Sequence, residues 1–227
     1  MVPPEATHIH DSSGTPQNDD DIASLLSRLE ADGDPAEAQQ YSYFERAEWI
    51  CRSVSAGMLN AAAKLAGKSD AALHCAFIHS LYCEGYVALA EQNLSEIPPA
   101  LLRKPKPPYQ EISRIYGEIL YDQARYEEAG SLFIALAEIC PTMPTVRYAA
   151  TACHLQEKIQ RLRRRMELYH PDKEEVRKIE KYIHGFMSMI EIIAMTQWHT
   201  SWNEAQSRNL PEYLKTDPHT IKPLVSP

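Results

Sequence analysis

Three side chains that could bind a metal recur at helical spacing in the first half of the chain. Cys75, His79 and Cys83 stand four residues apart, so one helix would present all three on the same face. Helical rise separates the two cysteines by roughly 12 Å, which is too far for one ion to bind all three. Apolar residues surround the three positions. We therefore expect a buried helix here and no metal site.

No other motif in the sequence predicts catalysis. The chain has no glycine-rich phosphate loop, no nucleophile elbow and no His-Glu-x-x-His motif. The sequence thus predicts a protein that is not an enzyme, with no catalytic residues and no cofactor.

The tripeptide His170-Pro171-Asp172 follows a basic stretch and resembles the loop of a J-domain. That resemblance implies a co-chaperone that stimulates a heat-shock ATPase through these three residues. However, Arg165 and Glu167 stand where a J-domain helix has apolar core residues. The alternative interpretation is a helix that starts at Pro171 and Asp172 after an exposed basic helix.

Proline positions divide the chain into helices. Long proline-free runs, only eight glycines and no alternating runs of Val, Ile and Thr predict an all-α protein. A short helix begins at Asp20 or Asp21 and carries Leu25, Leu26 and Leu29. The further expected helices are 36–66, 70–94, 109–124, 126–140, 143–169 and 172–207. Ser69 and Asp172 are the candidate N-caps of the third and the last helix.

Composition shifts predict four regions. Residues 1–18 are expected to be a disordered tail, and residues 19–102 an N-terminal helical subdomain. The proline-rich stretch 103–108 reads as an extended linker. Residues 109–207 are expected to form a second helical subdomain, and residues 208–227 a loose C-terminal tail.

The net negative charge of the protein comes from one end of the chain. Of the net charge of −8, all comes from residues 1–37, which hold nine acids and one base. The remaining residues hold 22 acids and 22 bases, so no basic face favours nucleic acid, and we expect no nucleic-acid partner.

The cysteines and the hydropathy of the chain bear on its compartment. Five cysteines, an odd number without a Cys-x-x-Cys pair, lie in apolar contexts and indicate buried, reduced thiols. No secretory signal precedes them. The longest apolar stretch, 186–195, contains Ser188 and Glu191 and is too short to span a membrane. We expect a cytoplasmic protein.

One 34-residue stretch, 110–143, carries a repeat-like pattern. In this stretch the small Gly117 lets two helices approach, and Ala129 of the second helix packs against it. Phe133 fills the space toward the next unit, and Pro141 ends the second helix. The stretch resembles a tetratricopeptide repeat, with departures at Ser113 and Leu120. The pattern weakens in the following residues, and 34 residues upstream Cys83, Ser95 and Pro99 occupy the equivalent positions.

The resemblance implies stacked antiparallel helix pairs, a short solenoid or bundle, with a concave face that binds peptides or helices. Its concave-face positions are mixed and charged on one helix and mostly apolar on the next, which favours an amphipathic helix or an extended apolar segment as ligand. The expected partner-binding residues are Arg114, Glu118, Tyr121, Tyr148, Ala152 and Leu155. The alternative is that the first or last helix of the same chain fills this groove.

The stretch 121–158 is also similar to the class II chaperones of bacterial type III secretion, which are built from these repeats and hold translocator proteins. A carboxylate clamp is disfavoured, because Glu118 would repel an acidic ligand. The sequence thus predicts a protein-binding adaptor, scaffold subunit or chaperone, and it predicts no oligomeric state.

An aromatic cluster of Trp198, His199, Trp202 and Glu204 is expected to cap the packing near the end of the last helix.

Overall fold

A computed structural model describes residues 19–67, 69–141, 143–196 and 198–199. These residues form eleven α-helices and no strand, which confirms the predicted all-α class. The predicted tails 1–18 and 208–227 lie outside the described residues. The helices are α1 (Asp19–Ala31), α2 (Pro35–Gln39), α3 (Tyr43–Ser55), α4 (Leu59–Ala66), α5 (Ala71–Cys83), α6 (Val87–Ser95), α7 (Pro99–Arg103), α8 (Gln110–Asp122), α9 (Tyr126–Ile139), α10 (Pro144–Tyr169) and α11 (Lys173–Ala194).

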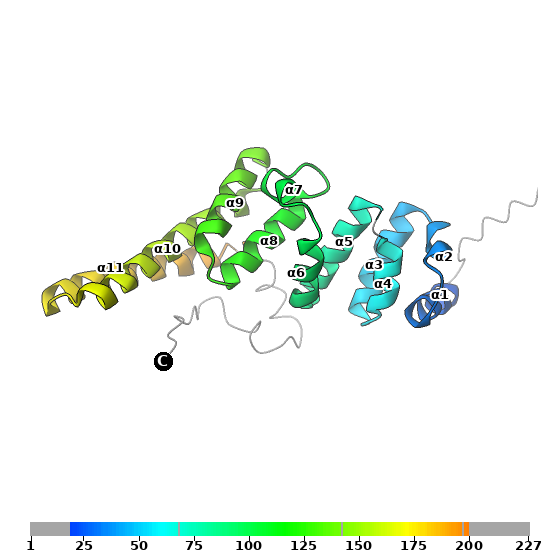
Figure 1. The fold of residues 1–227 in the computed structure, drawn as a ribbon, viewed down its shortest axis with the longest axis horizontal. Coiled ribbons are helices and arrows are strands. Elements are labelled where there is room, and N and C mark those ends of the chain that lie inside the picture. Colours follow the sequence, from blue (N-terminus) through cyan, green and yellow to red (C-terminus); the bar gives the residue numbers. More distant parts are fainter. Residues whose placement is uncertain (1–18, 68, 142, 197, 200–227) are drawn as a thin grey trace, which may run out of the picture.

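The helices stack in chain order along one long axis (Figure 1). Helix α1 packs on α4, α3 on α4 and α5, α5 on α8, and α8 on α9. The longest helices, α10 and α11, form a hairpin that projects from the far end of the stack, where α10 packs on α9. None of the described helices is both long enough and apolar enough to cross a bilayer.

Two helices expected from the sequence are each divided. The run 36–66 contains α2, α3 and α4, and the run 70–94 contains α5 and most of α6. The break between α3 and α4 is at Gly57 (φ 77°), and the break between α5 and α6 is at Gly85 (φ 85°). A left-handed residue ends a helix and reverses the chain, and glycine adopts this conformation without steric cost.

The same turn joins three helix pairs. Each time, the N–H after the left-handed residue donates to a carbonyl five residues back, as in a Schellman motif. The bonds are Met58 to Ser53 (2.8 Å), Tyr86 to Leu81 (2.8 Å) and Arg125 to Leu120 (2.9 Å). A fully buried alanine stands five residues after each left-handed residue: Ala62, Ala90 and Ala129.

The second and third of these turns are 39 residues apart, since they centre on Gly85 and Ala124 (φ 59°). The extra residues form α7 and the stretch that precedes α8. Here the expected extended linker is instead a turn around the cis peptide Pro107-Pro108, with the N–H of Tyr109 donating to Lys106 O at 2.8 Å. The changed spacing explains why a fixed 34-residue register finds nothing upstream of α8.

Helix α8 connects the two parts of the core. Its residues Ile112, Ile115 and Ile119 pack with the core of helices α1–α7. Leu120 and Tyr121, on the same helix, pack with α9 and α10. The packing therefore continues through the stretch where the sequence suggested a boundary between subdomains.

The short helix α4 is held at both ends by side chains from other helices. Glu30 of α1 accepts from the backbone N–H of Ala61 (2.9 Å), and Arg46 of α3 donates to Leu65 O at 3.0 and 2.6 Å. These groups satisfy orphan donors and acceptors that the local sequence leaves unpaired.

Asp172 caps the last helix as predicted and accepts two backbone N–H groups of the first turn of α11 at 2.9 and 2.8 Å. Ser69 is not the cap of α5, because Asp70, one residue later, takes that role at 3.0 and 3.2 Å. The helix expected to reach residue 207 ends at Ala194, where the chain turns.

Candidate functional site

The six residues predicted to line a partner groove lie on two helices, with Arg114, Glu118 and Tyr121 on α8 and the others on α10. Five of the six are in the interior, with exposed fractions of 0–9%, and only Tyr148 is exposed. These five residues therefore do not form an open groove in this structure. That a partner binds them stays a prediction.

Charged residues are buried on α8 because they pair with one another. The guanidinium of Arg114 contacts the carboxylates of both Glu111 and Glu118, and Glu118 is fully buried. The hydroxyl of Tyr82, from α5, donates to Glu118 Oε2 at 3.0 Å. Burial opposes ionisation of Glu111, but the hydrogen bond and charge of Arg114 outweigh it, so the pKa of Glu111 lies below its usual value.

Two residues that follow α11 cover this part of α8. Trp198 and His199 are almost completely buried, and the ring of Trp198 lies 5.0 Å from that of Tyr121. Their predicted role as a packing cap is confirmed, although they lie beyond the helix rather than on it. Trp202 and Glu204 lie outside the described residues. The alternative that the last helix of the same chain fills this groove fits in part, since Ile190 of α11 packs with Leu155, whereas Trp198 and His199 lie after that helix.

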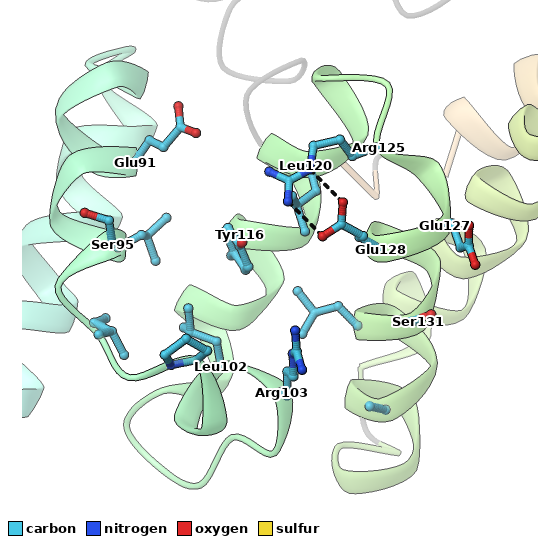
Figure 2. A pocket seen from close by; sticks show the side chains of 15 residues that line it. Glu91, Ser95, Leu102, Arg103, Tyr116, Leu120, Arg125, Glu127, Glu128 and Ser131 are labelled. Carbon is cyan, nitrogen blue, oxygen red and sulfur yellow. Dashed lines mark hydrogen bonds and ion pairs between the residues drawn. The ribbon is translucent and has the colours of Figure 1, made fainter.

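An open cavity of about 730 Å³ lies on the other side of α8, between α6, α7 and α9 (Figure 2). Its walls are largely apolar and its rim is charged. The apolar residues are Leu94, Ile97, Pro99, Leu102, Tyr116, Leu120, Leu132 and Ala135. The charged residues are Glu91, Arg103, Arg125, Glu127 and Glu128.

Both signs of charge occur on the rim of this cavity. The guanidinium of Arg125 makes two hydrogen bonds to Glu128, at 2.8 and 2.7 Å, and the hydrogen bond holds the pKa of Glu128 below its usual value. Glu91 lies across the cavity on α6, and Arg103 lies at the end of α7 (Figure 2). An apolar floor between charges of both signs suits an amphipathic ligand.

Sequence reasoning missed this cavity because it depends on α7. The five-residue helix, Pro99–Arg103, packs against α8 and α9 and closes one end of the space between α6 and α9. Its sequence adjoins the proline-rich stretch that reads as a linker. The sequence does contain a signal for the turns upstream of α7. Gly57 and Gly85 are each followed five residues later by an alanine, and this spacing marks the two turns.

All five cysteines are free thiols, but not all are buried as predicted. Cys51 is exposed and Cys83 is half-buried, because both lie on outward-facing helix positions. Cys83 Sγ lies 3.7 Å from His79 Nε2, while Cys75 packs in the core. Within the described ranges, no three His, Cys, Asp or Glu side chains converge on a common point as metal ligands would.

Comparison with known proteins finds no protein family, no curated protein and no solved structure that matches this chain.

Proposed function

We propose that this chain is a protein-interaction module of tetratricopeptide-like build, which acts as an adaptor, scaffold subunit or chaperone in the cytoplasm. The single observation that carries the proposal is the cavity between α6 and α9, with its apolar walls and charged rim. The three helix pairs with one shared turn support the repeat-like build.

The proposed ligand is an amphipathic helix or a short extended segment with apolar side chains. The cavity volume of about 730 Å³ falls within the range of roughly 300–1,000 Å³ that is typical of ligand clefts. Apolar side chains of the ligand would contact Pro99, Tyr116 and Ala135, which line the cavity and are not fully buried. Charged side chains of the ligand would pair with the acids and bases of the rim, and these pairs would set the position of the ligand along the cavity.

Site-specific photo-crosslinking tests the proposal. A benzophenone amino acid replaces Ser131, which is exposed and lines the cavity, and in a matched control replaces Glu138, which is exposed on the same helix and is not among the residues that line the cavity. We expect one partner to crosslink in native cells from position 131 and not from position 138. Ala135→Arg should abolish that crosslink while the helix content is unchanged.

Equal crosslinking from the two positions, or a crosslink that survives Ala135→Arg, would contradict a binding site in this cavity. Export chaperones of the class II type III secretion kind are one form of this function. For that alternative the crosslinked partner is a secreted translocator, whereas an adaptor crosslinks to a resident cytoplasmic protein.

A second candidate function is a J-domain-like co-chaperone. The observation that favours it is the position of His170, Pro171 and Asp172 in the turn between the antiparallel helices α10 and α11. However, Arg165, which stands where a J-domain helix has an apolar residue, forms an ion pair with Glu175 of the other helix. A co-chaperone would stimulate an Hsp70 ATPase and lose that activity in His170→Gln, whereas an adaptor would be unaffected by the change.

A further inference from the structure

The interior site on α8 opposite the cavity holds an aromatic side chain of the chain itself. The ring of Trp198 lies edge-on to Tyr121 (centroids 5.0 Å apart) and to Phe133 (6.0 Å). Trp198 is 3% exposed and packs in the same cluster as Ala152 of α10. Such edge-to-face contacts add to the gain from burial. Helices α8, α9 and α10 thus build a socket for one large aromatic ring.

The carboxylates of Glu118 and Asp122 lie directly beside this socket, and the side chain of His199 lies between them. His199 Nε2 lies 3.2 Å from Asp122 Oδ1, and His199 Nδ1 lies 3.6 Å from Glu118 Oε2. Along this face, α8 carries three acids but one base, Arg114, which is engaged by Glu111 and Glu118. A positive charge between Glu118 and Asp122 therefore improves the local balance of charge.

The two occupants belong to none of the described helices. Helix α11 ends at Ala194, only a few residues before Trp198. The pair can therefore leave the site without unwinding any helix. The arrangement is a two-residue ligand that the chain supplies to its own binding site.

We propose that this face of α8 and α10 recognises a segment in which a bulky aromatic residue is followed directly by a basic one, with Trp198 and His199 as the internal occupant. A partner segment with Trp-Lys or Trp-Arg then competes with them, because Lys and Arg carry a full charge at neutral pH. This inference is independent of the proposed function, since the cavity lies on another side of α8.

Peptide binding to the full chain tests the inference. Short fluorescent peptides with a central Trp-Lys, Trp-Glu or Ala-Lys are titrated with the natural chain and with the variant Trp198→Ala/His199→Ala, and anisotropy is measured. The Trp-Lys peptide should bind the variant at least about tenfold more tightly than the natural chain, because the internal competitor is gone. The other two peptides should bind the variant at least about tenfold more weakly than Trp-Lys does.

The inference is overturned if the Trp-Glu peptide binds the folded variant as tightly as Trp-Lys does. It is also overturned if no peptide binds a variant whose circular dichroism matches that of the natural chain.

A second variant keeps the test valid if the loss of Trp198 unfolds the chain. Asp122→Lys places a cation at the partly exposed rim of the site and leaves both aromatic rings in place. Hydrogen exchange at the amides of Trp198 and His199 should become at least about tenfold faster, because the carboxylate that lies 3.2 Å from His199 Nε2 is replaced by a cation. Glu138→Lys, a charge reversal on the exposed face of α9, is the matched control. Unchanged exchange in Asp122→Lys overturns the role of the carboxylates.

Discussion

Replacing Gly117 by alanine tests how closely α8 and α9 approach. A β-carbon at Gly117 would lie 2.6 Å from Phe133 Cζ and 2.7 Å from its Cε1. Carbon atoms in contact normally lie 3.5–4.0 Å apart, so the ring must move by about 1 Å. Phe133 is fully buried and contacts Trp198, which leaves the ring no free space to enter.

The expected change combines two opposing terms. Alanine in place of glycine inside a helix stabilises by about 1 kcal/mol. Overpacking of a closed core costs about 1–3 kcal/mol. The difference predicts that Gly117→Ala lowers the free energy of unfolding by up to about 2 kcal/mol.

Gly185→Ala is the matched control, because a β-carbon there meets nothing within 4 Å. This variant has the same gain in propensity and no clash, so it should raise the free energy of unfolding by about 0.5–1 kcal/mol. Urea unfolding followed by circular dichroism measures both variants. Adding Phe133→Leu to Gly117→Ala should give a loss smaller than the sum of the two single losses. An increase in stability in Gly117→Ala like that of Gly185→Ala would refute the close approach of the helices.

Three further predictions concern a helix cap, a buried ion pair and a buried thiol. Glu30→Gln weakens the cap that α1 provides to α4 and should cost about 1 kcal/mol in urea unfolding; a loss below the error of the measurement would contradict the capping role. Arg114→Met leaves the buried carboxylate of Glu118 without its cation and should cost about 3–5 kcal/mol, which thermal and urea unfolding would both detect. Burial raises the pKa of the Cys153 thiol to about 12, so at pH 8 iodoacetamide should label the exposed Cys51 first, as mass spectrometry can follow. Equal labelling rates in the folded chain would refute the burial of Cys153.

Part of the candidate site follows from the sequence. The pattern of Gly117, Ala129 and Phe133 predicted a closely packed helix pair. The structure shows this close approach, but the atoms nearest to Gly117 belong to the Phe133 ring, which was expected to fill the space toward the next unit, and not to Ala129. The same pattern pointed to α8 and α10 as facing helices. The sequence could not predict that Glu118 is buried, because the burial of a charge depends on partners from distant parts of the chain, here Tyr82 and His199.

By itself, the sequence determined which segments are helical and where many of them start and end. These features depend on interactions within a few residues, so they can be predicted from the sequence. They are the exclusion of proline from helices, the cap at Asp172 and the apolar spacing along each helix. Gly57 and Gly85 carried the same kind of local signal for the two missed turns.

Only the tertiary structure decided which helix faces are open. The insertion of α7 leaves the cavity beside α8, and residues beyond α11 cover the face that the repeat pattern had suggested for a partner. Both outcomes depend on contacts between segments far apart in the chain. Helical periodicity tells which residues share a face, but the packing of the whole stack determines what that face meets.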